Sequence, residues 1–225
     1  MQNASRPCSR ANRFVIAATA ALVMAALPYH AHSQVGAQSE LASALQATPD
    51  RARGQRLFDT CAACHRPDGA GAADGSVPAI ASQRLRVIAL ALVNFRHQQR
   101  FDERMQHFAD AHHLDGAQDI ADVAAYVSQL PATHSLGNGP GEQVAHGGQL
   151  YARDCASCHG AVAQGDEQRG YARLAGQHYQ YLMRQMGDSA ATQRPDLTPV
   201  HVALLKSLSA SDRSAVADYL SRQGP

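Results

Sequence analysis

Apolar residues follow a helical spacing in the segment 119–131. Five of them recur three or four positions apart, namely Ile120, Val123, Ala124, Val127 and Leu130. Pro131 then stops the run. Residues 85–95 predict a second helix that is apolar on much of its surface, and alternating patterns typical of strands are nearly absent. We therefore expect an all-α protein.

The pattern occurs twice along the chain. Residues 54–58 correspond to residues 147–151, and Ile80-Ala81-Ser82-Gln83 corresponds to Leu174-Ala175-Gly176-Gln177, 94 positions later. The end of the first helical run also has a counterpart, because residues 119–126 match residues 212–219. An internal repeat of this length indicates a duplicated domain.

The repeat predicts a first domain at residues 34–131 and a second at residues 143–225. The glycine-rich segment 132–142 is the expected linker. Asp119 and Asp212 are expected near the first turn of the last helix of each domain, where a carboxylate interacts favourably with the helix dipole.

Residues 1–33 predict an export signal peptide. Three arginines precede an apolar stretch at residues 14–27, and Ala31-His32-Ser33 offers small residues for cleavage before Gln34. An uncleaved anchor is the alternative, although the apolar stretch is short for a membrane span. Cleavage would place the mature protein in the periplasm, without a stable membrane span.

Charge excludes one class of partner. Removing the three leader arginines changes the formal net charge from +1 to −2, and residues 132–225 carry eight basic and eight acidic side chains. A nucleic-acid-binding surface needs a clustered excess of basic residues, so we expect no nucleic-acid partner.

Two copies of the pattern C-x-x-C-H carry the chemistry. They are Cys61-Ala62-Ala63-Cys64-His65 and Cys155-Ala156-Ser157-Cys158-His159. This pattern is the attachment site of a c-type haem: the cysteines form thioethers with the haem vinyl groups and the histidine binds the iron. Zinc binding, a redox dithiol and disulfide bonds are the alternatives, and none explains a histidine at the same place twice. We predict two covalently attached haems.

These motifs resemble the class I cytochromes c, and their duplication resembles the tandem dihaem cytochromes of the c(4) kind. The shared features are G-x-x-L-[FY] before C-x-x-C-H, the [IL]-A-x-Q segment, and D-x-x-x-[VL]-A-x-Y, each present twice. The resemblance implies about three main helices around each haem. It also implies that the carbonyl of Pro78 supports the proximal histidine His65, and the second half has Ala172 at that place.

The sixth iron ligand departs from the family pattern, which uses a methionine about forty residues beyond the motif. His107 and His201 each lie 42 residues after the motif histidine, at His65 and His159. We therefore expect His107 and His201 as distal ligands. Met105, two residues before His107, is the alternative in the first half.

Six-coordinate iron on both haems leaves no open position for a substrate, which favours electron transfer. The leading hypothesis is a periplasmic carrier of single electrons between respiratory redox partners, without catalytic residues. The alternatives are a dihaem oxidoreductase that acts on a small sulfur compound or peroxide, and a gas-binding haem protein.

Overall fold

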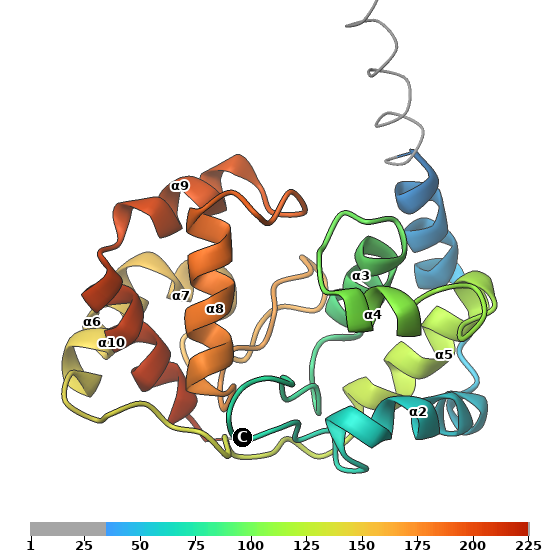
Figure 1. Cartoon of the computed structure of the whole chain (residues 1–225), viewed down its shortest axis with the longest axis horizontal. Coiled ribbons are helices and arrows are strands. Elements are labelled where there is room, and N and C mark those ends of the chain that lie inside the picture. Colours follow the sequence, from blue (N-terminus) through green and yellow to red (C-terminus); the bar gives the residue numbers. More distant parts are fainter. Residues whose placement is uncertain (1–34, 225) are drawn as a thin grey trace, which may run out of the picture. The chain divides into compact units, whose positions relative to one another are not determined.

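The computed structural model describes residues 35–224. From residue 37 onward the described chain forms one compact unit, which contains the helices α2 to α10. The predicted signal peptide lies outside the described residues. Within residues 37–224, one group of helices comes from the first half of the sequence and a second group from the second half (Figure 1).

The first half contains four helices after a helical segment at residues 37–46. They are α2 (Arg51–His65), α3 (Leu85–Arg96), α4 (Glu103–Phe108) and α5 (Gly116–Ser128). The expected helices at residues 85–95 and 119–131 are thus α3 and α5. Asp119 lies in the first turn of α5, as expected, and its carboxylate accepts a hydrogen bond from the backbone N–H of Asp115 at 2.8 Å.

The second half repeats this order with one additional short helix. Its helices are α6 (Val144–Asp154), α7 (Ala156–His159), α8 (Tyr179–Ala190), α9 (Pro199–Ser207) and α10 (Ala210–Ser221). Asp212 lies in the first turn of α10 and forms a capping box with Ser209. Between residues 35 and 224 the only β-type pairing is an isolated bridge of Asp166 with Tyr171. The all-α prediction is confirmed.

Each half is built on a close helix crossing, of α2 with α5 and of α6 with α10. A Cβ atom on Gly54 would lie 2.0 Å from the backbone oxygen of Asp122, and one on Gly147 would lie 1.9 Å from that of Ala215. Both positions therefore require glycine, which explains why it recurs in the repeat. An aromatic pair lies at each crossing, Phe58 with Tyr126 and Tyr151 with Tyr219.

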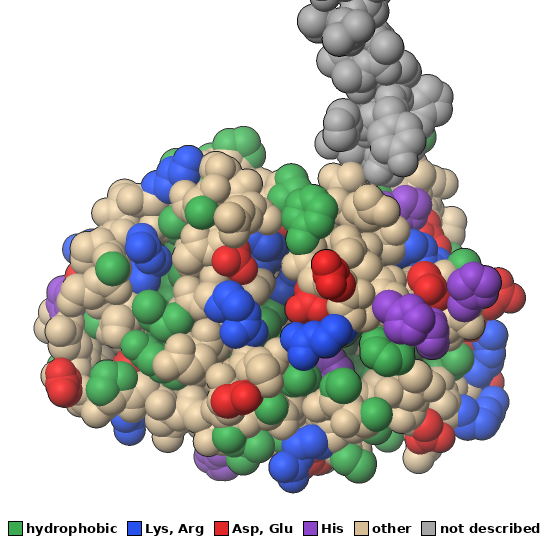
Figure 2. Space-filling model, in the orientation of Figure 1, with side chains coloured by type: hydrophobic (Ala, Val, Ile, Leu, Met, Phe, Trp, Pro, Cys, Tyr) green, Lys and Arg blue, Asp and Glu red, His purple; other side chains and the backbone are tan. Residues whose placement is uncertain are grey.

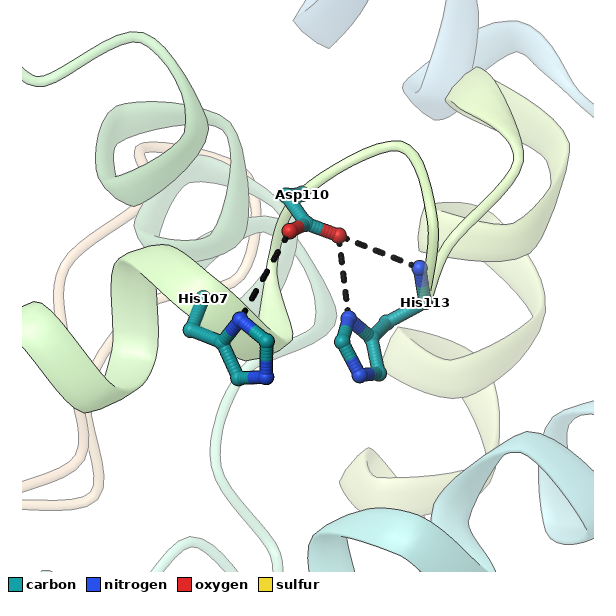
Figure 3. Close-up of side chains that lie close together, drawn as sticks. All are labelled: His107, Asp110 and His113. Carbon is teal, nitrogen blue, oxygen red and sulfur yellow. Dashed lines mark hydrogen bonds and ion pairs between the residues drawn. The ribbon is translucent and has the colours of Figure 1, made fainter.

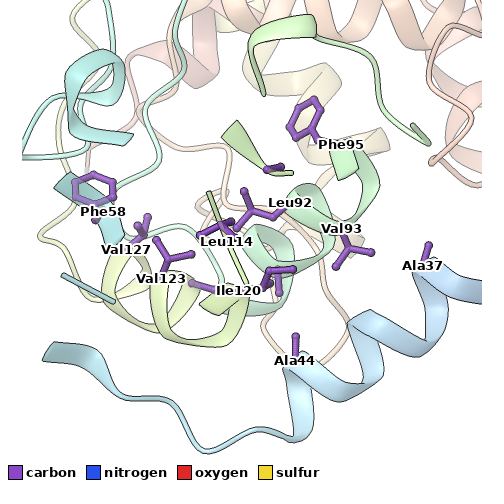
Figure 4. Packing of buried hydrophobic residues seen from close by; sticks show 13 residues of the cluster. Ala37, Ala44, Phe58, Leu92, Val93, Phe95, Leu114, Ile120, Val123 and Val127 are labelled. Atoms are coloured by element: carbon purple, nitrogen blue, oxygen red, sulfur yellow. The ribbon is translucent and has the colours of Figure 1, made fainter. Parts of the chain in front are cut away.

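A separate apolar cluster fills each half. In the first, side chains of α2, α3 and α5 converge, with Phe58, Val93 and Ile120 among the buried members (Figure 4). In the second, Leu150, Val216 and Leu220 are among the corresponding residues. Cys61 and Cys155 pack against these clusters, so the first cysteine of each C-x-x-C-H motif lies beside an apolar core.

The two halves contact each other through equivalent positions. Arg84 donates from Nε to the backbone oxygen of Gln164 at 2.8 Å. Its counterpart, His178, donates from Nε2 to the backbone oxygen of Ala70 at 2.7 Å. Each residue corresponds to its counterpart 94 positions later, so the interface has the reciprocal character of a twofold dimer contact within one chain.

The linker is bound into this interface. The backbone N–H of Leu136 donates to Nδ1 of His178 at 3.3 Å, and that of Tyr179 donates to the oxygen of Gly137 at 2.9 Å. His178 is fully buried there. Among residues 35–224, no helix is both long enough and apolar enough to cross a membrane.

Candidate haem-binding centres

The motif histidines occupy equivalent positions at the ends of α2 and α7. Nδ1 of His65 donates to the backbone oxygen of Pro78 at 3.1 Å, and Nδ1 of His159 donates to that of Ala172 at 2.8 Å. Because Nδ1 carries the hydrogen, the lone pair of each ring is on Nε2 and is available to a metal. The alanine at position 172 thus serves as well as the proline, because the acceptor is a backbone carbonyl.

Burial keeps both histidines in the form that binds iron. Desolvation lowers the pKa of His65 and of His159, and this outweighs the hydrogen bond to Pro78 or Ala172, which raises it. A lowered pKa favours the neutral imidazole, the form that can bind a metal.

The cysteines are not arranged as a reactive dithiol or a zinc site. Burial raises the pKa of Cys61 and of Cys155 to about 11, whereas a reactive dithiol needs a lowered value. In the described part of the chain, neither motif belongs to a group of three potential metal ligands. The neutral thiols of Cys61 and Cys155, each beside an apolar cluster, suit thioether formation with a haem.

In the second half, the structure brings His201 to the motif histidine. The ring centroids of His159 and His201 lie 6.1 Å apart. Two imidazoles on opposite sides of one metal ion, each with a metal–nitrogen bond of about 2 Å, have centroids about 6 Å apart. Desolvation, followed by the nearby His159, lowers the pKa of His201 and favours its neutral form. This pair fits an iron between the rings.

In the first half, the residue equivalent to His201 is Met105. His201 is the third residue of α9, and its backbone N–H donates to the side chain of the N-cap Thr198 at 3.3 Å. Met105 is the third residue of α4, and its backbone N–H donates to the side chain of the N-cap Asp102 at 3.1 Å. Met105 also packs against the apolar cluster of its domain.

The start of α4 lies near the first motif histidine. Besides desolvation and the hydrogen bond to Pro78, two charged side chains influence the pKa of His65. The charge of Arg104 lowers this pKa, and the charge of Asp102 raises it. Both residues precede Met105, Asp102 as the N-cap of α4 and Arg104 as its second residue.

His107 has different surroundings from those expected of a distal ligand. Its side chain is 62% exposed, and its ring centroid lies 4.5 Å from that of His113. Both rings approach the carboxylate of Asp110, with His113 at 2.9 Å and His107 at 3.8 Å (Figure 3). The structure therefore does not bring His107 to His65. Residues 105 and 107 lie about 200° apart around a helix, so one faces away when the other faces the core.

The donor sets of both halves fit a c-type haem. Each contains two cysteines for thioether bonds and a neutral histidine with a free Nε2, and each carries a thioether or an imidazole at the third position of α4 or α9. Imidazole and thioether are the axial ligands that haem iron takes in electron carriers.

Comparison with known proteins agrees with this arrangement. The family model described as cytochrome c matches the chain twice, at residues 51–131 and 144–223. Cytochrome c4 of Azotobacter vinelandii is 29% identical over 196 residues, which cover 77% of this chain and 89% of that protein. Cytochrome c4 of Pseudomonas aeruginosa is 27% identical, with the same coverage.

Solved structures show the same fold. Reduced recombinant cytochrome c4 from Pseudomonas stutzeri superimposes with a TM-score of 0.71 at 24% identity, covering 79% of this chain and all of that one. Thiosulfate dehydrogenase (TsdBA) from Marichromatium purpuratum gives a TM-score of 0.64 at 28% identity, covering 78% of this chain and 40% of that one.

Proposed function

Because the chain belongs to the cytochrome c family, with two domains in tandem and two c-type haems, we propose that it carries single electrons between respiratory redox proteins in the periplasm. The protein is a dihaem electron-transfer cytochrome. The observation that supports the finer proposal is the pairing of His201 with His159 at 6.1 Å between ring centroids, with Met105 at the equivalent helix position in the first domain. Ligands on both sides of each iron would leave no position for a substrate.

The chemistry requires little movement of the protein. A c-type haem supplies one-electron chemistry, because its iron alternates between the ferric and ferrous states. The chain's own residues hold the ring planes fixed: His65 and His159 are oriented by the carbonyls of Pro78 and Ala172. Rigid ligation means that little reorganisation accompanies each electron.

We propose that the distal ligands are Met105 in the first domain and His201 in the second. The equivalent helix positions and N-cap bonds support this pair, as does the 6.1 Å separation of the His159 and His201 rings. The expectation of His107 relied on its spacing from His65, and its exposed side chain argues against it. Sulfur ligation favours ferrous iron, so the first haem would have the higher potential.

We propose the domain layout given by the repeat: a leader at residues 1–33, domains at residues 34–131 and 143–225, and a linker between them. The two matches to the family model, at residues 51–131 and 144–223, support the domain boundaries. Secretion to the periplasm is supported by the leader sequence and by haem attachment, which takes place outside the bacterial cytoplasm.

Redox partners would dock on a surface of mixed charge. On the face drawn in Figure 2, basic and acidic side chains are interspersed, with hydrophobic side chains between them. Phe101 and Val200 are exposed hydrophobic residues, at 64% and 81% exposure, and lie close in sequence to the proposed distal ligands. Short-lived docking of electron-transfer partners suits small, mixed surfaces of this kind.

The oxidoreductase alternative gains no specific support. The free cysteines of residues 35–224 are the four motif cysteines, which haem attachment consumes, so none of them supplies a thiolate ligand. The match to thiosulfate dehydrogenase covers 40% of that chain, so it supports a shared fold and not a shared activity.

Intact mass and a reductive titration of the secreted protein test the proposal. We expect a polypeptide that begins near Gln34, carries the mass of two haems, and takes up two electrons per chain. A mass that corresponds to one haem would contradict the proposal. So would steady catalytic turnover of thiosulfate or peroxide at a rate above that of an electron carrier assayed without its redox partners.

A further inference from the structure

Two equivalent glutamines cross between the domains. Gln83 precedes α3 in the first domain and Gln177 precedes α8 in the second, 94 positions later. Gln177 Oε1 accepts from the backbone N–H of Ala79 at 3.0 Å, and its Nε2 donates to the backbone oxygen of the same residue at 2.8 Å. Gln83 makes the same pair of bonds to Arg173, at 2.8 Å and 3.0 Å.

The orientation of each side-chain amide is fixed by its neighbours. Oε1 of Gln177 also accepts from the backbone N–H of His178 at 2.9 Å, and Oε1 of Gln83 accepts from that of Arg84 at 3.0 Å. Two N–H donors face the oxygen and one carbonyl faces the nitrogen, so a flipped amide would lose all three bonds.

The peptide groups that these glutamines hold are the ones that orient the iron-binding histidines. The N–H of Ala79 belongs to the same peptide as the carbonyl of Pro78, which accepts from Nδ1 of His65. The N–H of Arg173 belongs to the same peptide as the carbonyl of Ala172, which accepts from Nδ1 of His159. Each chain of hydrogen bonds therefore runs from the glutamine of one domain, through one peptide, to the histidine of the other.

We propose that Gln83 and Gln177 are positioning residues that set the redox potential of the haem in the opposite domain. A peptide whose N–H is bonded has a more basic carbonyl, because hydrogen bonds in series polarise one another. A stronger acceptor at Nδ1 makes the histidine a stronger electron donor to the iron, which stabilises the ferric state and lowers the potential. Gln177 thus lowers the potential of the first haem, and Gln83 that of the second.

This arrangement ties haem tuning to the domain interface. A movement that separates the domains would break both pairs of bonds and raise both potentials together. The inference rests on the proposed function in that His65 and His159 must bind iron, so haem content and reversible reduction are verified first. Absence of a haem would refute the proposed function, whereas the pattern of potentials tests the glutamines alone.

The experiment compares Gln177→Met and Gln83→Met in the full-length holoprotein, by redox titration followed by NMR. The ring resonances of His65 and His159 report separately on the two irons. In Gln177→Met, the ferric-to-ferrous ratio of the first haem at a fixed potential should fall about threefold, equivalent to about 30 mV for one electron, and the second haem should not change. Gln83→Met should give the reverse.

Tyr181→Phe provides a matched control. It removes another neutral acceptor between the domains, the hydroxyl that accepts from Arg100 Nη2 at 2.7 Å, without touching either peptide. It should change neither potential. The inference is overturned if each glutamine variant changes the potential of the haem in its own domain. It is also overturned if both potentials change equally in each variant, or if neither potential changes.

A second substitution is used if the Gln177→Met variant does not fold and incorporate its haems. Gln177→Glu keeps an oxygen for the N–H of Ala79 and adds negative charge, so the potential of the first haem should fall by more than that of the second. A rise in that potential, or an equal change at both haems, would contradict the proposal.

Discussion

Helices α4 and α9 start in the same way but carry different side chains at the position of the proposed distal ligand. Both begin after an N-cap side chain that accepts from the backbone N–H of the third residue, and that residue is Met105 in α4 and His201 in α9. The proximal sides, by contrast, have the same histidine and the same carbonyl bond. The two halves therefore share the attachment of the haem, and in our proposal they differ in the sixth ligand, which influences the potential.

The proximal sides also show which substitutions do not alter the geometry. Pro78 and Ala172 differ in side chain but present the same backbone oxygen to the histidine. A function carried by the backbone is unaffected by a change of residue type, whereas the proposed ligand at positions 105 and 201 changes with the side chain.

The largest expected effect distinguishes Met105 from His107. Met105→Ala should remove the sixth ligand of the first haem, so that the ferrous protein binds carbon monoxide at one haem per chain. His107→Ala should leave the spectrum unchanged, because that side chain pairs with Asp110 at the surface. Absorption spectra with and without carbon monoxide measure both. Carbon monoxide binding in His107→Ala alone would show that the spacing from His65, and not the helix register, identifies the ligand.

The shared helix crossing gives the next effect. Gly147→Ala should lower the free energy of unfolding by about 3 kcal/mol, because its Cβ would lie 1.9 Å from a backbone oxygen that cannot move independently. Gly54→Ala should do the same in the first domain. Denaturant unfolding of the holoprotein measures this.

Gly148 is the matched control for that crossing. A Cβ there would meet the ring of Tyr219 at 3.1 Å, and a ring can shift. Gly148→Ala should change stability by no more than about 1 kcal/mol, the size of the helix-propensity gain. Equal losses at positions 147 and 148 would refute the close-crossing explanation.

Exchanging the ligand type should make the two domains more alike. His201→Met should raise the potential of the second haem by on the order of 0.1 V, a fraction of the roughly 0.8 V that axial ligands span. This corresponds to about 2 kcal/mol per electron. A redox titration should then show two potentials closer together than in the wild type. An unchanged lower potential would mean that His201 does not bind the iron.

The buried interface histidine gives the smallest effect. Burial lowers the pKa of His178, and this outweighs the bond to Ala70 and the charge of Asp74, which raise it. The unfolded state therefore binds a proton at about pH 6.5 while the folded state does not. The contribution of His178 to the free energy of unfolding is therefore fully present above that pH. It is lost as the pH falls, by at most about 1.4 kcal/mol per pH unit.

Replacing His178 with Gln should flatten the loss of stability below pH 6.5, as measured by unfolding at several pH values. His134, an exposed linker residue, is the control, and His134→Gln should leave the profile as it is. An unaltered profile in His178→Gln would show that the interface does not exclude the proton.

The features that the two domains share could be predicted from the sequence, whereas residue spacing and helix register favour different sixth ligands in the first domain. Helical periodicity located α3 and α5, and the repeat located both attachment motifs, because these depend on local patterns. Counting residues selected His107, since both histidines stand 42 positions after the motif histidine. The connection from Arg96 to Glu103 is shorter than that from Ala190 to Pro199, so equal counts reach different positions in the two helices.

The role of the repeated glutamines could not be predicted from one half of the chain. Gln83 and Gln177 stand out by their repetition, but their hydrogen-bond partners lie 90 and 98 residues away in the sequence. Only the packing of one domain on the other brings them to the peptides that orient the histidines.

The absorption spectrum of the fully oxidised protein tests the central claim, that the two domains differ in their sixth ligand. Ligation of ferric haem by methionine sulfur gives a weak band at the red edge of the spectrum, and ligation by two histidines does not. With Met105 and His201 as ligands, the band should have the intensity expected for one methionine-ligated haem per chain, that is, for half of the haems present. Its absence, or an intensity equivalent to two haems, would contradict the account.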